Sequence, residues 1–324
     1  MVTGGSGFIG SNFIRYVLNK HPDYDVVNYD VMTYAGNPDN LKDIEESKNY
    51  RFVHADIDDY DKAIEVMKDS QAVVNFAAES HVDRSITGAR QFMLTNVVGT
   101  NTLLEAARSA NLERFLHIST DEVYGSIDEG SFFESDNLVP SSPYSASKAA
   151  SDLACHAYKT TYDLPIIITR SSNNFGPFQY PEKLIPLLIT NLLDNKSLPI
   201  YGDGKNVRDW IYVEDNCAAI DRVLHEGQIG EVYNIGGGME VENIEIANMI
   251  LEIMDRPKSS ITYVKDRPGH DRRYSINSRK LHNLGFKPEF DFSSALEKTI
   301  NWYTENVAWW RRLKLKQEDH ANEA

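Results

Sequence analysis

Two short segments of the sequence carry side chains whose types and spacing suit redox chemistry on an alcohol. Tyr144 and Lys148 lie four residues apart, so on a helix they share one face. Thr120, 24 residues before the tyrosine, ends a strand-like run from which its hydroxyl can approach the same phenol. This grouping suits removal of a proton from an alcohol while a hydride leaves its carbon. Asp121 and Glu122 follow directly. An alcohol dehydrogenase does not need these two carboxyl groups, so they indicate a second reaction, for which elimination of water is the natural candidate.

Three glycines near the start of the chain predict a cofactor site. Gly4, Gly7 and Gly10 have a G-x-x-G-x-x-G spacing just before an amphipathic helical pattern. Glycines allow a tight turn and close approach to a pyrophosphate, which is stabilised at the helix N-terminus. Asp30 ends the next predicted strand, 20 residues after Gly10, where a carboxylate can bind the adenosine ribose and repel a 2′-phosphate. Together these features favour NAD over NADP.

Each of these patterns also has a purely structural explanation. Asp56 and Ile57 follow the third predicted strand and can flank the adenine, but a polar turn explains them equally well. Tyr-x-x-x-Lys can be an exposed helical pair, and Asp-Glu before a valine can start a turn. The joint placement of the motifs after predicted strands, together with the glycines, favours the chemical interpretation.

The pattern of strands and helices that must position these residues predicts an α/β fold. We expect a Rossmann-type doubly wound parallel sheet with a smaller C-terminal substrate-binding domain. Short apolar runs alternate with helical patterns in the first half, as in a parallel sheet covered on both faces. Strands are predicted at 25–30, 51–55, 72–77, 114–119 and 165–169. Helices are predicted at 9–19, 61–69, 90–110, 145–162, 182–194, 242–254 and 293–304.

Two domains are expected, an NAD-binding Rossmann domain over residues 1–172 and a mainly substrate-binding domain over residues 173–324. Glycine and proline punctuate the second part. The boundary is expected to be interleaved, because a strand at 232–235 can join the first sheet. Only three residues precede Gly4, so the first strand is either very short or truncated.

Composition excludes several classes of function. A net charge of −15 argues against a nucleic-acid surface. Cys155 and Cys217 fit neither a disulfide framework nor a zinc site, and no metal site is predicted. No secretory signal and no bilayer-spanning apolar run is apparent, so the expected location is the cytoplasm, away from membranes.

With these motifs in view, the chain resembles the extended short-chain dehydrogenase/reductase family and, within it, the dTDP-glucose 4,6-dehydratases. The resemblance runs from residue 1 to about residue 305, and the triplet Thr-Asp-Glu and the segment DRPGHDRRY are specific to dehydratases of this type. Epimerases and reductases share the glycines and Tyr-x-x-x-Lys. The chain departs from the pattern of this family in its short first strand and at Met32. The matching segments are 3–10, 30–37 (DVMTYAGN), 76–85 (FAAESHVDRS), 119–125 (STDEVYG), 144–148 (YSASK), 170–177 (RSSNNFGP), 202–215 (GDGKNVRDWIYVED) and 266–274 (DRPGHDRRY).

The resemblance implies a reaction on a nucleotide-activated hexose, with dTDP-glucose as the expected substrate. Tyr144 is expected to take the proton of the sugar 4-hydroxyl, with Thr120 bonded to the same oxygen. Lys148 and the positive nicotinamide would favour the phenolate. Glu122 would remove the C5 proton while Asp121 protonates the departing 6-hydroxyl. The hydride taken from C4 would return to C6, giving dTDP-4-keto-6-deoxyglucose.

The resemblance also assigns ligand contacts. Further cofactor contacts are expected from Phe8, Ile9, Thr33, Ala77, Ala78 and Asn174. Substrate contacts are expected from Ser80, Thr120, Asn173, Lys183, Leu184, Pro199, Tyr201, Arg208, Asn243, Asp266, Arg267 and His270. Arg272 and Arg273 can add to a set of arginines for the diphosphate, although surface carboxylates can equally pair with them. Tyr34 is expected to pack over the cofactor, and His81 to have a structural or orienting role.

A homodimer and two alternative functions complete the expectations. Related enzymes pair the helices around 90–110 and 145–162 across a dimer, although a monomer core explains the same apolar pattern. A nucleotide-sugar 4-epimerase would use the tyrosine, lysine and NAD but gains nothing from Asp121 and Glu122. A non-catalytic NAD-sensing binding protein would usually lack the Tyr-Lys pair. Discrimination among nucleotide bases rests on the resemblance alone.

Overall fold

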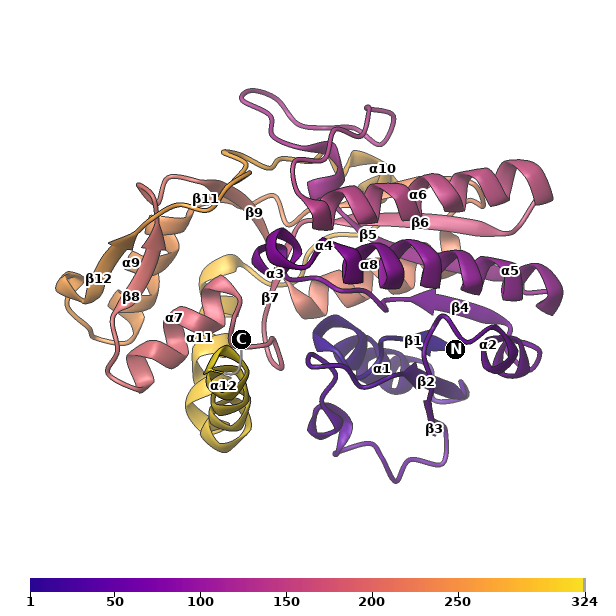
Figure 1. Cartoon of the computed structure of the whole chain (residues 1–324), viewed down its shortest axis with the longest axis horizontal. Coiled ribbons are helices and arrows are strands. Elements are labelled where there is room, and N and C mark those ends of the chain that lie inside the picture. The colour runs from indigo at the N-terminus through magenta and orange to yellow at the C-terminus, as the bar shows by residue number, and fades with distance from the viewer. Residues whose placement is uncertain (323–324) are drawn as a thin grey trace.

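A seven-stranded sheet forms the centre of the molecule (Figure 1). The computed structural model describes residues 1–322, and side chains as far as residue 316. The strand order is β10-β6-β5-β4-β1-β2-β3, and every neighbouring pair is parallel. The predicted Rossmann-type class is therefore confirmed. The strands are β1 (Val2–Thr3), β2 (Val26–Asp30), β3 (Tyr50–His54), β4 (Ala72–Asn75), β5 (Arg114–Thr120), β6 (Ile166–Ser171) and β10 (Val232–Ile235).

Helices cover both faces of this sheet, because its central strands are apolar on both sides. One face packs against α1 (Phe8–Lys20) and α8 (Val213–Glu226). The other packs against α2 (Tyr60–Met67), α5 (Thr100–Ala110) and α6 (Pro143–Tyr162). Since α8 and β10 come after residue 173 but pack with the first sheet, the chain crosses between the two parts more than once. The domain division at residue 172 stays a prediction.

One predicted helix is interrupted. Residues 90–110 were expected to form a single helix, but they form α4 (Ala89–Phe92), a π-helical segment η2 (Met93–Gly99) and α5. Within η2, the carbonyl oxygen of Asn96 accepts a hydrogen bond of 2.5 Å from the Ser151 hydroxyl of α6. A side chain that bonds a helix carbonyl disturbs the regular ladder, which explains the wider turn.

The second part of the chain has its own small sheets and core. Strands β7 (Asn173–Phe175), β9 (Val207–Tyr212) and β11 (Glu240–Glu242) form a three-stranded sheet, while β8 (Leu198–Tyr201) pairs with β12 (Ile261–Val264). The helices α7 (Leu184–Leu193), α9 (Asn243–Ile253) and α11 (Phe292–Glu305) pack on them around a third apolar cluster. Among the described residues, no helix combines the length and apolar character that crossing a bilayer requires.

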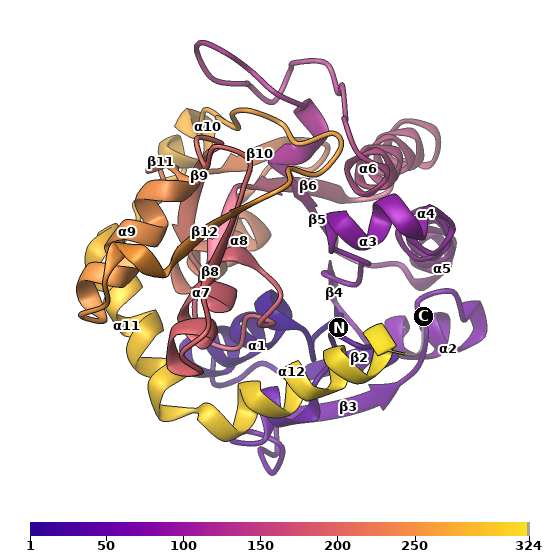
Figure 2. The same cartoon turned by 60° about the vertical axis from the view of Figure 1, so that its left-hand side comes forward.

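The last helix, α12 (Val307–Asn322), was not predicted and links the two parts. In Figure 2 it is the yellow helix that runs from α11 toward β2 and β3. Trp310 is fully buried in the third cluster, and the Trp309 indole donates a hydrogen bond of 3.0 Å to Asn40 Oδ1 beyond β2. Arg312 pairs with Asp39 in the same loop. These contacts tie α12 to the Rossmann part.

Candidate active site

The glycine turn between β1 and α1 forms a backbone cradle. Gly4 has a φ of +64°, and a Cβ there would lie 2.7 Å from backbone atoms of Ala77. A Cβ at Gly10 would lie 2.4 Å from the carbonyl oxygen of Gly4. Gly7 is the N-cap of α1 and makes no side-chain cap, so the first N–H groups of the helix are available to an anion. This geometry requires glycine and fits a pyrophosphate.

Asp30 lies at the carboxyl end of β2, beside this turn. Its Oδ2 accepts a hydrogen bond of 2.9 Å from the Ser6 N–H, and its Oδ1 accepts one of 2.7 Å from the Met32 N–H. Burial raises the pKa of Asp30, and these two bonds oppose the rise. A carboxylate has about four acceptor positions, so each oxygen retains a lone pair for a ribose hydroxyl.

A cavity of about 250 Å³ opens between these elements, at the point where the order of the parallel strands reverses from β1 to β4. The residues of the expected cofactor site that line it are Gly4, Gly7, Phe8, Ile9, Gly10, Asp30, Thr33, Asp56, Ile57, Ala77, Ala78, Tyr144 and Lys148. Asn174 does not line the cavity, and its Nδ2 donates a hydrogen bond of 3.0 Å to the Ser172 carbonyl. The cradle, the acid and the cavity together fit a dinucleotide.

Several residues around this cavity were not predicted. Trp309 and Leu313 of α12 line it, as does Glu182. Glu182 accepts a hydrogen bond of 3.0 Å from the Tyr34 hydroxyl, while the Arg84 guanidinium lies 3.8 Å from the centre of the Tyr34 ring. Tyr34 is in the cofactor segment quoted above, but α12 lies beyond the stretch that carried the resemblance, so no motif pointed to it.

The hydroxyl, the acids and the tyrosine expected at the reaction centre lie at the ends of neighbouring elements. Thr120 ends β5, and its hydroxyl accepts a bond of 3.3 Å from the Glu122 N–H and donates one of 3.3 Å to Asp121 Oδ1. Tyr144 lies in the first turn of α6, and Lys148 follows one turn later. The Lys148 ammonium donates a 2.7 Å bond to the Ile118 carbonyl of β5, which ties α6 to the sheet.

The electrostatics of the Tyr-Lys pair reflect deep burial. Burial, and then the charge of Glu122, raise the pKa of Tyr144, whereas a hydrogen bond with Thr120 lowers it. Burial lowers the pKa of Lys148 to about 8. The protein alone therefore keeps the phenol protonated near neutral pH, and a further positive charge in the site is needed to favour the phenolate.

The environments of the two adjacent carboxyl groups differ. Burial and the nearby Glu122 and Asp209 raise the pKa of Asp121 well above its usual value. The pKa of Glu122 is also raised, chiefly by burial, but Lys183, Arg208 and Arg267 limit the rise. Asp121 is thus favoured as the neutral acid, while the basic neighbours of Glu122 favour its anion.

Three basic side chains lie near Glu122, those of Lys183, Arg208 and Arg267. The Lys183 ammonium donates a bond of 2.7 Å to the Ser80 carbonyl. Arg208 is buried, donates a bond of 2.9 Å to the Asp271 carbonyl, and lies 4.1 Å from the centre of the Tyr274 ring. Nη1 of Arg267 is buried and has no hydrogen-bond partner in the protein. An anionic ligand would satisfy this group.

Tyr274 was within the quoted DRPGHDRRY segment but was not assigned a role. Its hydroxyl donates a bond of 2.8 Å to Asp271 Oδ2 and lies 3.5 Å from Glu122 Oε2. By contrast, Arg272 and Arg273 point to other partners, since they pair with Asp203 at 2.8 Å and Glu240 at 2.7 Å. Of the two alternatives left open for Arg272 and Arg273, the structure thus shows pairing with surface carboxylates.

The remaining predicted substrate residues belong to several elements and one loop of the second part of the chain. His270 Nδ1 lies 2.6 Å from Asp266 Oδ1, and the Tyr201 ring packs edge-on against the His270 ring. Pro199 and Tyr201 belong to β8, Leu184 begins α7, Asn243 begins α9, and Asn173 begins β7. The side-chain oxygens of Asn173 and Asn243 are buried without a partner, which leaves them available to a ligand.

His81 takes the structural role expected for it. It is the N-cap of α3 (Val82–Thr87), where Nδ1 accepts a bond of 3.3 Å from the Arg84 N–H. Burial, followed by nearby positive charges, lowers the pKa of His81 to about 3. A ring that is held neutral and bonded to the backbone is a poor candidate for the catalytic base.

Comparison with known proteins gives one consistent assignment. Residues 1–299 match the sequence profile of the family described as GDP-mannose 4,6 dehydratase. The chain is 54% identical over 303 residues to the low-salt glycan biosynthesis protein Agl12 of Haloferax volcanii, covering 94% of this chain and 97% of that protein. It is 49% identical over 323 residues to a dTDP-glucose 4,6-dehydratase of Streptomyces niveus, covering 98% of this chain and 96% of that one.

Solved structures agree with these sequences. The crystal structure of DesIV, a dTDP-glucose 4,6-dehydratase of Streptomyces venezuelae with NAD bound, matches with a TM-score of 0.95 and 51% identity over 96% of this chain and 98% of DesIV. A UDP-glucuronic acid 4-epimerase of Bacillus cereus matches with a TM-score of 0.89, but at 30% identity over 94% of this chain and 98% of the epimerase. The fold is thus common to both classes, and the sequence is much closer to the dehydratases.

Proposed function

The chain belongs to the GDP-mannose 4,6-dehydratase family, and we propose that it is an NAD-dependent dTDP-glucose 4,6-dehydratase. It removes one water from dTDP-glucose and yields dTDP-4-keto-6-deoxyglucose. Relatives of about half-identical sequence, each covered over nearly their whole length, carry this activity in their names. The 4-epimerase alternative is less well supported, since the epimerase of known structure is only 30% identical.

The observation that carries the proposal is the pair formed by the buried Asp121 and the half-buried Glu122 beside Thr120. Burial and acidic neighbours favour a proton on Asp121, whose pKa is raised well above the ordinary value. Burial raises the pKa of Glu122 as well, but three basic groups limit that rise and so favour the anion of Glu122 over that of Asp121. One acid and one base side by side suit an elimination, in which a proton is removed at C5 and a hydroxyl leaves C6. An epimerase has no use for this pair.

The cofactor proposed for the cavity is NAD. Bound there, NAD would accept a hydride from the sugar and later return it. The glycine cradle would bind the pyrophosphate, and Asp30 would bind the adenosine ribose. The remaining proposed contacts are Phe8, Ile9, Thr33, Asp56, Ile57, Ala77, Ala78, Tyr144, Lys148 and Asn174.

The roles proposed for the protein side chains follow from their positions. Tyr144 takes the proton of the sugar 4-hydroxyl, and Thr120 bonds the same oxygen. Lys148 bridges α6 and β5 through the Ile118 carbonyl and provides positive charge near the phenol. Glu122 removes the C5 proton, and Asp121 protonates the leaving 6-hydroxyl. When bound, NAD would supply the positive charge that favours loss of the Tyr144 proton.

The substrate diphosphate is proposed to lie against Arg208 and Arg267. Support comes from the unpartnered Nη1 of Arg267 and from the burial of Arg208, and the charges of both arginines act on Glu122. Guanidinium groups bind phosphate oxygens in a paired geometry. The other proposed substrate contacts are Ser80, Thr120, Asn173, Lys183, Leu184, Pro199, Tyr201, Asn243, Asp266 and His270.

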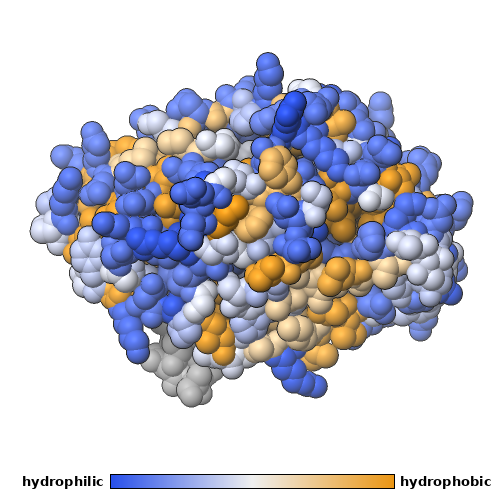
Figure 3. Space-filling view, turned by 90° about the horizontal axis from the view of Figure 1, so that it is seen from above, coloured by the Kyte–Doolittle hydropathy of each residue, from blue (hydrophilic) through white to orange (hydrophobic). Residues whose placement is uncertain are grey.

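We also propose a homodimer in the cytoplasm. Leu94 and Val98 of η2 and Leu153 of α6 are exposed by 36%, 43% and 61% on neighbouring helices. Figure 3 looks onto the molecule from above, and apolar side chains (orange) gather along its lower edge, the side that faces the viewer in Figure 1. A second copy packed on these helices would bury this surface. Cys155 and Cys217 are buried and unpaired, in keeping with a reducing compartment.

Two variants separate oxidation from elimination and test the proposal. Glu122→Gln and Asp121→Asn leave Tyr144 and the cofactor cradle untouched, so the 4-hydroxyl can still be oxidised. We expect absorbance of reduced nicotinamide to build up on both variants after addition of dTDP-glucose, while dehydrated product falls by roughly two to four powers of ten. Glu129→Gln, an exposed carboxyl in the following loop, is the matched control. Near-parental dehydration by both active-site variants would refute the acid and base roles.

A further inference from the structure

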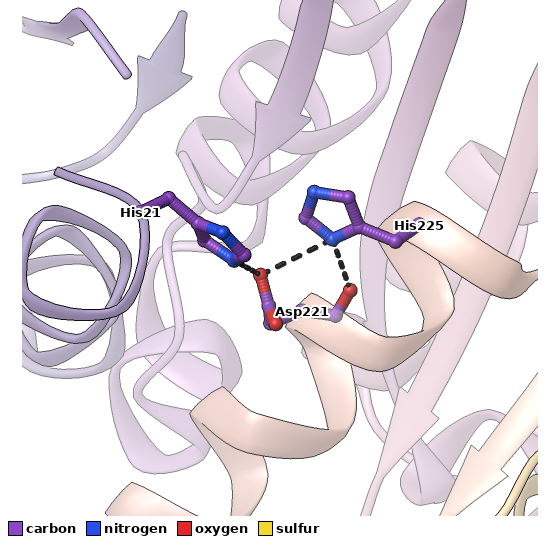
Figure 4. Close-up of side chains that lie close together, drawn as sticks. All are labelled: His21, Asp221 and His225. Carbon is purple, nitrogen blue, oxygen red and sulfur yellow. Dashed lines mark hydrogen bonds and ion pairs between the residues drawn. The ribbon is translucent and has the colours of Figure 1, made fainter. Parts of the chain in front are cut away.

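Two histidines and one aspartate cluster at the far end of α1 from the glycine turn (Figure 4). His21 directly follows α1, a helix about 20 Å long, while Asp221 and His225 lie one turn apart on α8. The two helices pack against each other, so the cluster joins residues 200 positions apart. No metal site was predicted here from the sequence, since no local motif connects such distant positions.

The donor atoms are already close together. His21 Nε2 lies 2.9 Å from Asp221 Oδ1, and His225 Nδ1 lies 3.2 Å from the same oxygen. One donor atom from each of the three residues lies within 4.8 Å of the others. A tetrahedral zinc ion with nitrogen and oxygen ligands at about 2.0 Å separates its ligands by roughly 3.3 Å. Small side-chain rotations would therefore admit the ion.

The burial of the three side chains suits an ion that enters from solvent. The Asp221 side chain is only 3% exposed, whereas those of His21 and His225 are 23% and 34% exposed. The carboxylate is thus largely desolvated, and the imidazoles form an open side where water can complete the coordination. Two imidazoles and a carboxylate are the donors that zinc and neighbouring transition metals prefer.

Neighbouring groups hold the donors in place. The Tyr24 hydroxyl lies 2.8 Å from His225 Nε2, and its ring stacks on His21 with centroids 4.7 Å apart. With a metal on Nδ1, the Nε2–H of His225 would donate to that hydroxyl, which is the outer bond that orients a ligating histidine. Without a metal, Nδ1 faces the Asp221 backbone carbonyl at 2.8 Å and can donate to it. Lys20 pairs with the second carboxylate oxygen at 3.0 Å and opposes a cation.

We propose that His21, Asp221 and His225 form a binding site for a divalent transition-metal cation, with Zn²⁺ as the ion tested. The ion would clamp the end of α1 to α8 and stabilise their packing. It would take no part in the reaction, because the cluster and the glycine turn lie at opposite ends of α1. The proposal does not depend on the proposed dehydratase activity.

The test uses the full chain without an affinity tag, loaded with NAD, stripped with a chelator and titrated with ZnCl₂ in a calorimeter. The parent is expected to bind one zinc ion per chain and to unfold at a higher temperature when zinc is present. His21→Gln and His225→Gln should each weaken zinc binding at least about tenfold and abolish the thermal shift. His156→Gln, an exposed histidine on α6, should bind zinc as the parent does.

A further variant reports on the charge at the site. Lys20→Met removes the cation that competes for Asp221, so it should bind zinc more tightly than the parent while retaining the thermal shift. The proposal would be overturned by the absence of saturable binding in the parent. Equal zinc affinity in the parent and His21→Gln would overturn it as well, because the ion would then lie elsewhere.

Discussion

At the scale of single residues, Tyr144 presents the clearest conflict between environment and role. Burial raises the pKa of Tyr144, yet the proposed mechanism needs its phenolate. We therefore predict that Tyr144→Phe folds and binds NAD like the parent, because the ring still fills its place on α6. Turnover should fall by roughly 10² to 10⁴, the usual contribution of a general base. Steady-state kinetics together with NAD titration measure both effects, and turnover within a few-fold of the parent would exclude this role.

A second prediction at this scale concerns Asp121 and pH. Its pKa is raised well above the unfolded value, so the folded chain binds more protons than the unfolded chain between these two pKa values. The favourable contribution of the protonated group is fully present below the unfolded pKa and is lost as pH rises through the folded pKa. Asp121→Asn lacks this titration. Its unfolding temperature relative to the parent should therefore increase as pH rises from about 4 to neutrality.

Thermal unfolding of the parent and Asp121→Asn between about pH 4 and neutrality measures whether the difference in unfolding temperature increases with pH. A constant difference between them would mean that Asp121 is ionised in the folded protein as readily as in the unfolded one. The proposed acid role would then lose its physical basis. Glu129→Gln, which changes an exposed carboxyl, is the control for a general effect of charge.

At the scale of elements, α12 connects the second part of the chain to the cofactor cavity. Trp309 lines the cavity and donates a 3.0 Å bond to Asn40, and Arg312 pairs with Asp39. We predict that Trp309→Ala weakens NAD binding about tenfold, equal to roughly 1.4 kcal/mol, by opening this wall. Leu315→Ala, at a 56% exposed position on the same helix, should leave the affinity unchanged. Calorimetric titration with NAD measures the affinity of the parent and of both variants. Equal affinity in the parent and in Trp309→Ala would show that α12 does not contribute to NAD binding.

The elements that could be predicted are those with strong local patterns. Six of the seven strands of the central sheet begin and end within two residues of the predicted bounds, because each is a short run between turn signals. The break at η2 could not be predicted, since it depends on a bond from Ser151 that only the folded chain provides. Helix α12 was missed because its sequence mixes tryptophans with many charges and has no clear apolar stripe.

At the scale of the whole molecule, the residues of the site also divide into those that local motifs predict and those that depend on contacts between distant segments. The position of Gly4, Asp30 and Tyr144 at the cavity could be predicted because short motifs fix their backbone positions. The contacts of Tyr274 with Glu122, and of Trp309 with Asn40, join segments more than 150 residues apart in sequence. No local spacing encodes such contacts. The correct pairing of Arg272 and Arg273 with Asp203 and Glu240 also depends on how the loops fold together.

The proposed dimer is tested at this scale. Leu153 is 61% exposed on α6, so Leu153→Asp should place a charge in the interface and shift the protein toward monomer. Tyr263→Asp changes a residue of similar exposure, 59%, on β12 and should leave the assembly unchanged. Sedimentation analysis of the parent and both variants measures the mass in solution. A monomeric parent, or an unchanged dimer in Leu153→Asp, would contradict the proposed interface.

The measurement that tests the central claim most directly is the mass of the product formed from dTDP-glucose deuterated at C4. The proposed dehydratase gives a product that is lighter by one water and retains the deuterium, now on C6, because the same cofactor accepts and returns it. An unchanged mass with altered stereochemistry at C4 would identify a 4-epimerase instead. Recovery of unaltered dTDP-glucose from enzyme that holds NAD would contradict the proposed activity altogether.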